Sequence, residues 1–384
     1  MRVAVDARLL RGGGIGRYIR EITSRWLQDD RSAGIRFLGH PDEIEAWLDQ
    51  LPRRGKAEVV PWRDPVYSLR AQVRWAVRGG RWTRDCDAVF FPHWDVPVTR
   101  NQPPRVVVVH DLIHFLEPGG FPAWKRFPGR LLLRRAIRSA GMVITVSEAT
   151  KRDLERWEPG AEPRIRVIPN GVPHEVFRPL DPAERERAMS RWGHLHPFLL
   201  FVGPLKPHKG AATALEALRE VRGTHSDLVL VQAGPPEVRD PDVARALEDR
   251  NLHGAFVQVG VLDDDELNDL YNLSACLVHP ARREGFGLPP AEAMAAGTPV
   301  LASDCSSLPE VVGSGGRLVP PGDPRAWSQA LREVLADDQL RDEMIRKGRA
   351  RVRRFSWDRS AGRTLEILEE VATESPPQRV GPRP

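Results

Sequence analysis

Short apolar runs alternate with stretches in which apolar residues recur at helical spacing, and this pattern continues almost from end to end. Val106–Val109 is apolar throughout, which is typical of a strand buried on both faces of a parallel sheet. Stretches such as Thr213–Val221, Asp264–Asn272 and Ala326–Leu335 have the period of helices that cover a sheet. The pattern predicts two doubly wound α/β domains. The expected strands are Val3–Val5, Ile35–Leu38, Ala88–Phe91, Val106–Val109, Met142–Val146, Ile165–Ile168, Phe198–Val202, Leu228–Val231, Phe256–Val259, Ala275–Val278, Pro299–Leu301 and Arg317–Val319.

The length of 384 residues suits two domains of ~100–200 residues each. A stretch rich in proline and glycine ends at Pro179-Leu-Asp-Pro182 and precedes a new helix–strand series. We therefore expect a first domain over residues 1–179 and a second over 180–356. A last helix over 357–372 is expected to pack on the first domain, and the proline-rich residues 373–384 are expected to be disordered.

The composition is that of an ordinary globular protein, with 28% charged and 41% hydrophobic residues. No apolar run approaches the ~18–20 residues that cross a bilayer, so no spanning helix is expected. The first residues read as a strand and not as a signal peptide. Cys86, Cys276 and Cys305 are few and scattered, which favours reduced thiols in a cytoplasmic protein and indicates no zinc site.

The net charge of +5 divides unevenly along the chain. Residues 1–180 carry 31 Lys and Arg against 21 Asp and Glu, a net of +10, whereas the remainder carries 26 against 31, a net of −5. The two halves are expected to face different partners. The basic half suits an anionic substrate or membrane surface; nucleic acid is not expected, because no recognised module accompanies the charge.

Two segments concentrate these basic residues among large apolar ones. The first combines Arg70, Arg74, Arg78 and Arg81 with Trp75 and Trp82; the second combines Trp124, Lys125, Arg126, Arg130, Arg134, Arg135 and Arg138 with Phe127 and Leu131–Leu133. Such mixtures suit a helix at an anionic membrane interface, and they equally suit a solvated helix face.

The strongest chemical signal is Glu284-Gly-Phe-Gly-Leu-Pro-Pro-Ala-Glu292, which follows an expected strand and opens a helix. Its glycines let a ligand approach the backbone, and the free N–H groups of the helix start can face an anion. The two carboxylates would repel a diphosphate unless they are turned toward hydroxyl groups. The segment therefore predicts a ligand with a diphosphate and diols on either side, as in a nucleotide sugar.

Glycines, cations and a histidine follow other expected strands. Gly12–Gly16 does not form GxGxxG, and a flexible turn is the alternative to a ligand-binding loop. Lys206, His208 and Lys209 form a cation group that suits a leaving diphosphate, or alternatively solvated loop charges. His110 ends a buried strand, where it either caps the strand or faces a ligand.

In this order the segments resemble glycosyltransferase family 4, whose members are retaining enzymes of the GT-B fold. The resemblance covers roughly residues 1–372 and implies two Rossmann-like domains that face each other across a cleft. The matching segments are Gly12-Gly-Gly-Ile-Gly16-Arg-Tyr, His110-Asp-Leu, Val143-Ile-Thr-Val-Ser147-Glu, Val167-Ile-Pro-Asn170-Gly-Val, Phe201-Val-Gly-Pro-Leu-Lys206-Pro-His-Lys209-Gly and Glu284–Glu292.

The resemblance also implies residue roles. It makes His110, Glu284 and Lys209 catalytic and expects no metal or cofactor. The basic segments, and not the resemblance, put Arg130, Arg134 and Arg135 on the acceptor or membrane side. Many relatives have an arginine where this chain has Pro204, so Lys206 or His208 is expected to replace it. The implied donor-binding residues are Gly14, Gly16, Lys206, His208, Lys209, Gly285, Phe286, Gly287, Leu288, Pro289 and Glu292, with Glu292 on the ribose diol.

The resemblance favours transfer of a hexose, mannose above others, from GDP-mannose to a glycan, lipid-linked or small-molecule acceptor, at the inner face of a membrane if the basic segments bind one. UDP-glucose and UDP-N-acetylglucosamine remain alternative donors. Two other functions stay open: a catalytically silent nucleotide-sugar-binding protein, which Pro204 would suit, and an NAD-dependent dehydrogenase, against which the missing GxGxxG argues.

Overall fold

The computed structural model describes residues 1–99, 103–117 and 123–374, which form two compact units. The first unit contains residues 1–171 and the segment from Trp357 onward, and the second contains Val172–Ser356. Each unit is a parallel sheet with helices on both faces, so the two predicted doubly wound α/β domains are confirmed. Among the described residues, no helix is both long and apolar enough to cross a bilayer.

The first unit has a seven-stranded parallel sheet in the order β3-β2-β1-β4-β5-β6-β7. All five residues of β5 are buried, as the continuous apolar run predicts. The strands are β1 (Arg2–Asp6), β2 (Gly34–Gly39), β3 (Ala57–Pro61), β4 (Ala88–Phe91), β5 (Arg105–Val109), β6 (Met142–Thr145) and β7 (Ile165–Val167). The helices are α1 (Gly13–Trp26), α2 (Pro41–Leu48), α3 (Leu69–Trp82), α4 (Ile113–Leu116), α5 (Ala123–Ser139), α6 (Glu148–Trp157) and α15 (Trp357–Glu374).

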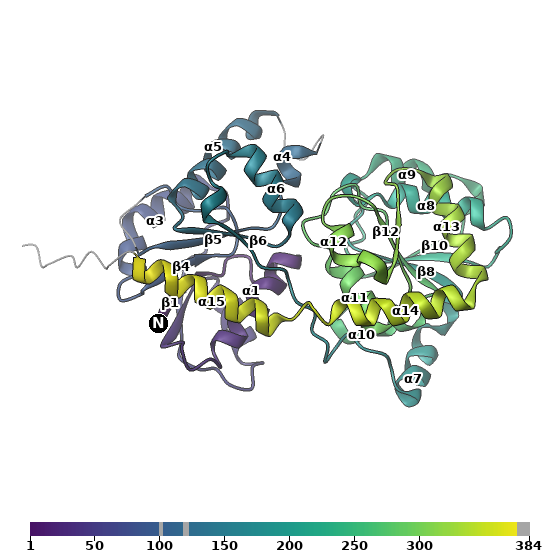
Figure 1. Ribbon diagram of the computed structural model, residues 1–384, viewed down its shortest axis with the longest axis horizontal. Helices are drawn as coiled ribbons and strands as arrows, with labels where there is room; N and C mark the ends of the chain where they lie inside the picture. The colour runs from purple at the N-terminus through teal and green to yellow at the C-terminus, as the bar shows by residue number, and fades with distance from the viewer. Residues whose placement is uncertain (100–102, 118–122, 375–384) are drawn as a thin grey trace, which may run out of the picture. The chain divides into compact units, whose positions relative to one another are not determined.

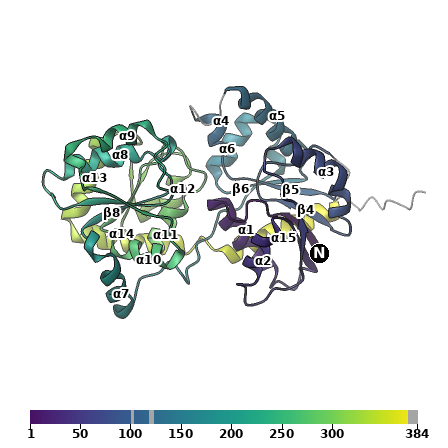
Figure 2. The ribbon, with the colours of Figure 1, turned by 180° about the vertical axis from the view of Figure 1, so that it is seen from behind.

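Successive side chains of β4 serve the two faces of this sheet. Phe90 packs against Tyr18 and Trp26 of α1, whereas Phe91 packs against Trp75 of α3. The core on the α3 side also contains buried residues of α5 and α6. The helix α15 lies beside α1 (Figures 1 and 2). The Ala361 carbonyl of α15 accepts a hydrogen bond from the Trp26 indole of α1 (2.9 Å).

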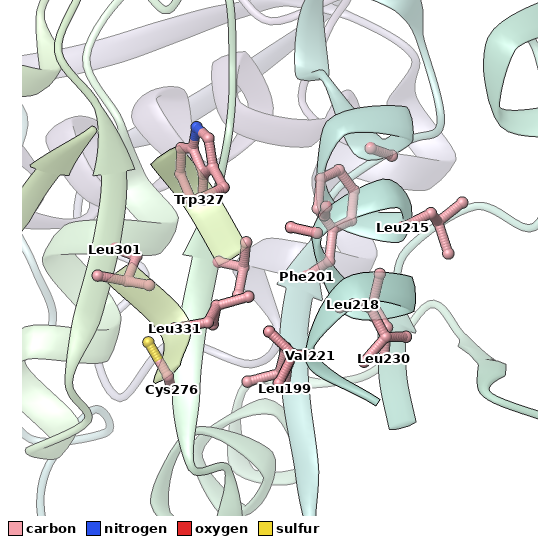
Figure 3. Close-up of a cluster of buried hydrophobic side chains, with 14 of the residues drawn as sticks. Leu199, Phe201, Leu215, Leu218, Val221, Leu230, Cys276, Leu301, Trp327 and Leu331 are labelled. Carbon is pink, nitrogen blue, oxygen red and sulfur yellow. The ribbon is translucent and has the colours of Figure 1, made fainter. Parts of the chain in front are cut away.

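The second unit has a six-stranded parallel sheet in the order β10-β9-β8-β11-β12-β13. Its core fills the space between this sheet and the helices α8 and α13, with Phe201, Leu218 and Trp327 among the buried residues (Figure 3). The strands are β8 (Phe198–Val202), β9 (Val229–Ala233), β10 (Phe256–Gly260), β11 (Cys276–His279), β12 (Val300–Ser303) and β13 (Arg317–Val319). The helices are α7 (Pro182–Trp192), α8 (Ala211–Val221), α9 (Pro241–Leu247), α10 (Asp264–Leu273), α11 (Leu288–Ala296), α12 (Leu308–Val312), α13 (Pro324–Ala336) and α14 (Asp338–Val352).

Three details differ from the pattern read in the sequence. The strand β3 is not predicted, because it is a half-exposed edge strand without a continuous apolar run. The units divide after Gly171 and not at residue 179, because Arg178 and Leu180 donate backbone hydrogen bonds to asparagines of α10 (3.2 and 3.0 Å). The helix α15 includes Thr373 and Glu374, and the rest of the expected disordered tail lies outside the described residues.

Candidate functional site

The loop after β11 turns sharply into α11 at a glycine. Gly287 has φ +105° and caps the helix. A Cβ there would lie 2.9 Å from the Leu308 side chain, so both the conformation and the space favour glycine. Pro289 and Pro290 occupy the first helical turn, where the missing N–H groups cost no helical hydrogen bond. The helix start predicted from the sequence is therefore where α11 begins.

Glu284, in this loop, joins two cationic or potentially cationic side chains. Its Oε2 accepts a hydrogen bond from Lys209 Nζ at 2.7 Å and lies 3.3 Å from His279 Nε2. The Lys209 and Glu284 side chains are only 15% and 14% exposed, so water screens the pair weakly. The structure thus brings together two of the three residues that the resemblance makes catalytic, at the carboxyl ends of β8 and β11.

The charges of this group follow from burial and proximity. Burial alone would raise the pKa of Glu284, but Lys209 and His279 hold it well below its usual range, so the carboxylate is ionised at neutral pH. Burial lowers the pKa of His279, even though Glu284 acts in the opposite direction. A neutral imidazole therefore lies beside a carboxylate–ammonium pair.

His279 and two serines are site residues that the sequence analysis missed. Ser306 donates to the Glu284 carbonyl oxygen (2.7 Å), and Ser307 donates to the carbonyl oxygens of Glu284 (3.0 Å) and Phe286 (2.8 Å). These two serines hold the backbone of the loop between β11 and α11 in place. His279 ends an otherwise apolar strand, which is the same signal that singled out His110, whereas the serines follow β12 in a stretch with no recognisable motif.

Gly210 joins the lysine loop to the helix α8 in a conformation that leaves no room for a side chain. Its φ is +70°, and a Cβ would lie 2.1 Å from the carbonyl oxygen of Pro280. The backbone N–H of Arg282 also donates to the His208 carbonyl (2.8 Å), so the loops after β8 and β11 lie against each other.

We expect Gly210→Ala to lower the stability of the protein by more than the roughly 1–3 kcal/mol that a non-glycine residue costs at positive φ, because backbone atoms must also move. Calorimetry should show a clear fall in melting temperature. Gly254→Ala is the matched control: Gly254 also has positive φ (+72°), but a Cβ there meets nothing within 4 Å. Equal effects of the two substitutions would contradict the packing argument.

The other predicted donor residues of the second unit occupy two places. Glu292 is buried in α11, where its Oε2 accepts a hydrogen bond from the Tyr271 hydroxyl of α10 (3.0 Å). Lys206 and His208 are half-buried beside Lys209, within or next to one turn of 3₁₀ helix. Gly285, Phe286 and Leu288 belong to the loop and helix start described above.

In the first unit, the glycine loop opens α1. The helix begins at Gly13; Gly14 is exposed in its first turn and Gly16 is buried. A Cβ on Gly16 would lie 2.5 Å from the Leu10 carbonyl oxygen, so this glycine is required for packing whatever else it does.

His110 directly follows β5 and is held by its neighbours. Its Nε2 lies 2.9 Å from the Pro92 carbonyl oxygen, and its ring meets the Tyr18 ring edge-on at 4.9 Å between centroids. Burial lowers the pKa of His110 to about 4, so the ring is neutral at physiological pH. Because a carbonyl only accepts, Nε2 carries the proton and Nδ1 is the acceptor.

A buried charge network, also missed in the sequence, lies at the carboxyl ends of β1 and β4. The Arg8 guanidinium binds the Asp6 carboxylate (2.7 Å) and the Asp95 carboxylate (3.1 Å), and it stacks over the Trp62 ring at 3.5 Å. His93 Nε2 lies 3.1 Å from Asp6 Oδ2. Against the effect of burial, Arg8 and His93 hold the pKa of Asp6 well below its usual value.

The arginines predicted for the acceptor or membrane side lie on α5. Arg134 pairs with Glu158, which directly follows α6 (3.0 Å), and Arg135 donates to the Val98 carbonyl (3.0 Å). Arg130 is exposed. Two of the three thus already have partners within the protein.

Comparison with known proteins identifies the family. The model of "Glycosyltransferase Family 4" matches residues 12–176, and that of "Glycosyl transferases group 1" matches residues 183–351. D-inositol 3-phosphate glycosyltransferases of Acidothermus cellulolyticus and Xylanimonas cellulosilytica are 32% and 31% identical, over 64% and 74% of this chain and 57% and 68% of their own lengths.

Another relative is the O-antigen chain mannosyltransferase B of Escherichia coli, 28% identical over 93% of this chain and 96% of its own. Among solved structures, Anabaena Alr3699/HepE in complex with UDP-glucose superposes with a TM-score of 0.78, covering 96% of this chain and all of that one, at 19% identity. That likeness supports the GT-B fold. The chain belongs to glycosyltransferase family 4.

Proposed function

We propose that this glycosyltransferase moves a hexose, with mannose favoured, from a nucleoside-diphosphate sugar to an acceptor hydroxyl, with retention of anomeric configuration and without a metal ion. The single observation that carries the proposal is the buried Lys209–Glu284 pair at the start of α11. It combines a cation for phosphate with a carboxylate for hydroxyl groups, near the positive end of the α11 helix dipole.

In this proposal, donor binding replaces the ion pair between Lys209 and Glu284 with an ion pair between Lys209 and the diphosphate. Without donor, Lys209 and Glu284 neutralise each other at 2.7 Å. A diphosphate competes for the ammonium group and supplies two negative charges in place of one. Glu284, which stays ionised because its pKa is low, then accepts hydrogen bonds from sugar hydroxyls. Glu292 is proposed to accept from the ribose diol in addition to Tyr271.

The transfer step needs no protein nucleophile in this proposal. The bond from the anomeric carbon to the diphosphate oxygen breaks, and a bond to the acceptor oxygen forms on the same face. The acceptor proton passes to the departing phosphate oxygen, so that the products are a glycoside and a nucleoside diphosphate. Lys209 stabilises the charge that develops on the leaving group. We propose that Nδ1 of neutral His110 accepts a hydrogen bond from a sugar hydroxyl.

The names of the relatives support mannose but leave the nucleotide open. Two O-antigen chain relatives are named mannosyltransferases, whereas the superposed Anabaena structure holds UDP-glucose. GDP-mannose is our first choice of donor. The acceptor is proposed to be a glycan, lipid-linked or small-molecule hydroxyl compound, and the net charge of +10 on residues 1–180 favours an anionic one.

A melting-temperature screen tests the donor site. At a concentration ~100 times its Kd, a donor adds about 2.7 kcal/mol of stability, which corresponds to a rise of roughly 5 °C or more. We expect GDP-mannose to give the largest rise among UDP-, GDP-, ADP- and dTDP-sugars, both with and without EDTA. No response to any of them would contradict the donor site, and a response that EDTA abolishes would contradict metal independence.

Activity separates the remaining alternative. A catalytically silent binding protein would show the melting response but release no nucleoside diphosphate with any acceptor. The dehydrogenase alternative is wrong, because the chain belongs to a glycosyltransferase family.

A further inference from the structure

Large apolar side chains are exposed mainly in one part of the first unit. Of the ten that are exposed among the described residues, seven lie between residues 67 and 131, and the other three are scattered through the second unit. Five of the seven belong to two helices. They are Leu69, Val73 and Val77 of α3 and Phe127 and Leu131 of α5.

The exposed residues of α3 form a stripe along the helix. Leu69, Val73 and Val77 recur every four residues and are 84%, 64% and 78% exposed, while Trp75 and Trp82 are buried in the core. The helix therefore has two apolar faces, and the sheet covers only one of them. Burial against this unit does not explain the outer stripe.

The helix α5 carries further exposed apolar residues in the same unit. Phe127 and Leu131 are 77% and 61% exposed, and α5 contributes to the same core as α3. Val98 connects the two helices: its N–H donates to the Gln72 side chain of α3 (3.0 Å), and its carbonyl accepts from Arg135 of α5. The exposed apolar residues of both helices thus lie on the side of the sheet that α3 and α5 cover.

All charged residues of these two helices are cationic. Neither α3 nor α5 contains an aspartate or glutamate, whereas α3 alone has four arginines. Arg74 pairs with Asp64, but Arg70, Arg78 and Arg81 form no ion pair with any residue that the structure describes. A two-fold contact with a second copy would bring two such cationic faces together, which electrostatic repulsion disfavours.

We propose that α3 and α5 form a docking surface for an anionic lipid bilayer, with Leu69, Val73 and Val77 entering the interfacial region and Arg70, Arg78 and Arg81 contacting lipid phosphates. Apolar insertion and attraction to anionic lipid together are what a stable interfacial helix requires. This surface adds the exposed apolar stripe of α3 to the basic segments picked out in the sequence, and it does not depend on the proposed donor or on transfer.

Vesicle flotation of the full chain tests the proposal. We use vesicles of phosphatidylcholine alone and vesicles containing about one third phosphatidylglycerol. The wild type should float with the anionic vesicles, and its partition coefficient should be roughly tenfold lower on neutral vesicles or in high salt. Leu69→Ser/Val73→Ser/Val77→Ser should lower binding to anionic vesicles by about tenfold or more. The melting temperature should stay unchanged, because these side chains are exposed.

Two further variants separate the apolar and ionic parts. Met189→Ser/Val238→Ser/Val261→Ser removes the three exposed apolar side chains of the second unit and should float like the wild type. Arg70→Gln/Arg78→Gln/Arg81→Gln should lose the preference for anionic vesicles. No flotation of the wild type, or equal losses in the two serine variants, would overturn the proposal. So would a dimer in analytical ultracentrifugation that the α3 serine variant disperses without any vesicle binding, since the surface would then join two copies.

Discussion

Lys209→Met is expected to lower the rate of nucleoside diphosphate release by about a hundredfold or more, because the departing diphosphate loses its cation in a water-poor site. The donor-induced rise in melting temperature should shrink as well. The protein without donor should also become less stable, since Glu284 would be left as a buried carboxylate without its ammonium partner, and breaking such a pair costs about 3–5 kcal/mol. Activity assays and calorimetry on the same preparation measure the two effects.

Two variants distinguish the catalytic loss from the structural one. Lys347→Met removes a lysine from a similar pair, with Glu343 at 2.6 Å, but on the exposed surface of α14, and should change neither activity nor stability by much. Lys209→Met/Glu284→Gln removes both buried charges and should recover stability without recovering activity. If the double variant regained activity, or if Lys209→Met kept activity within tenfold of the wild type, the leaving-group role would be refuted.

Local patterns predicted the doubly wound architecture because buried parallel strands and amphipathic helices are read directly from neighbouring residues. Val106–Val109 is an example: β5 is buried throughout. The edge strand β3 was not predicted, because it is partly exposed to solvent and therefore lacks a continuous apolar run. The boundary between the two units after Gly171 was not predicted. It depends on hydrogen bonds from Arg178 and Leu180 to asparagines about ninety positions later in the chain.

The same distinction applies to the site. Glu284, Gly287 and Lys209 were predicted because they lie in motifs whose order is specific. His279, Ser306 and Ser307 were not, since their function comes from loops that meet only after folding. The network of Arg8, Asp6 and Asp95 shows the limit most clearly. From the sequence, charged residues that follow apolar strands are expected to be solvent-exposed. Only the structure shows that these three are buried and form ion pairs with one another.

Arg8→Met is expected to lower the free energy of unfolding of the first unit by about 3–5 kcal/mol, because it leaves the buried Asp6 and Asp95 carboxylates without their shared guanidinium. At roughly 2–4 °C per kcal/mol, the melting temperature should fall by roughly 10 °C. The matched control is Arg31→Met in the same unit, where the pair with Asp29 (2.8 Å) is exposed and should contribute less than about 1 kcal/mol.

The pH dependence of the stability of Arg8→Met distinguishes the loss of the charge network from a packing defect, because the two predict different directions of change. In the wild type the pKa of Asp6 is lowered, so its contribution to stability is complete above the unfolded value of about 3.9 and is lost as the pH falls below it. In Arg8→Met only His93 still opposes the effect of burial, and we expect burial to prevail and to raise the pKa of Asp6 above its unfolded value. The folded variant then binds more protons than the unfolded chain, and its stability should increase as the pH falls from about 7 to 5. Calorimetry of both proteins across this range decides the matter: a melting temperature of Arg8→Met that changes with pH only as that of the wild type does would show that the guanidinium does not hold Asp6 ionised.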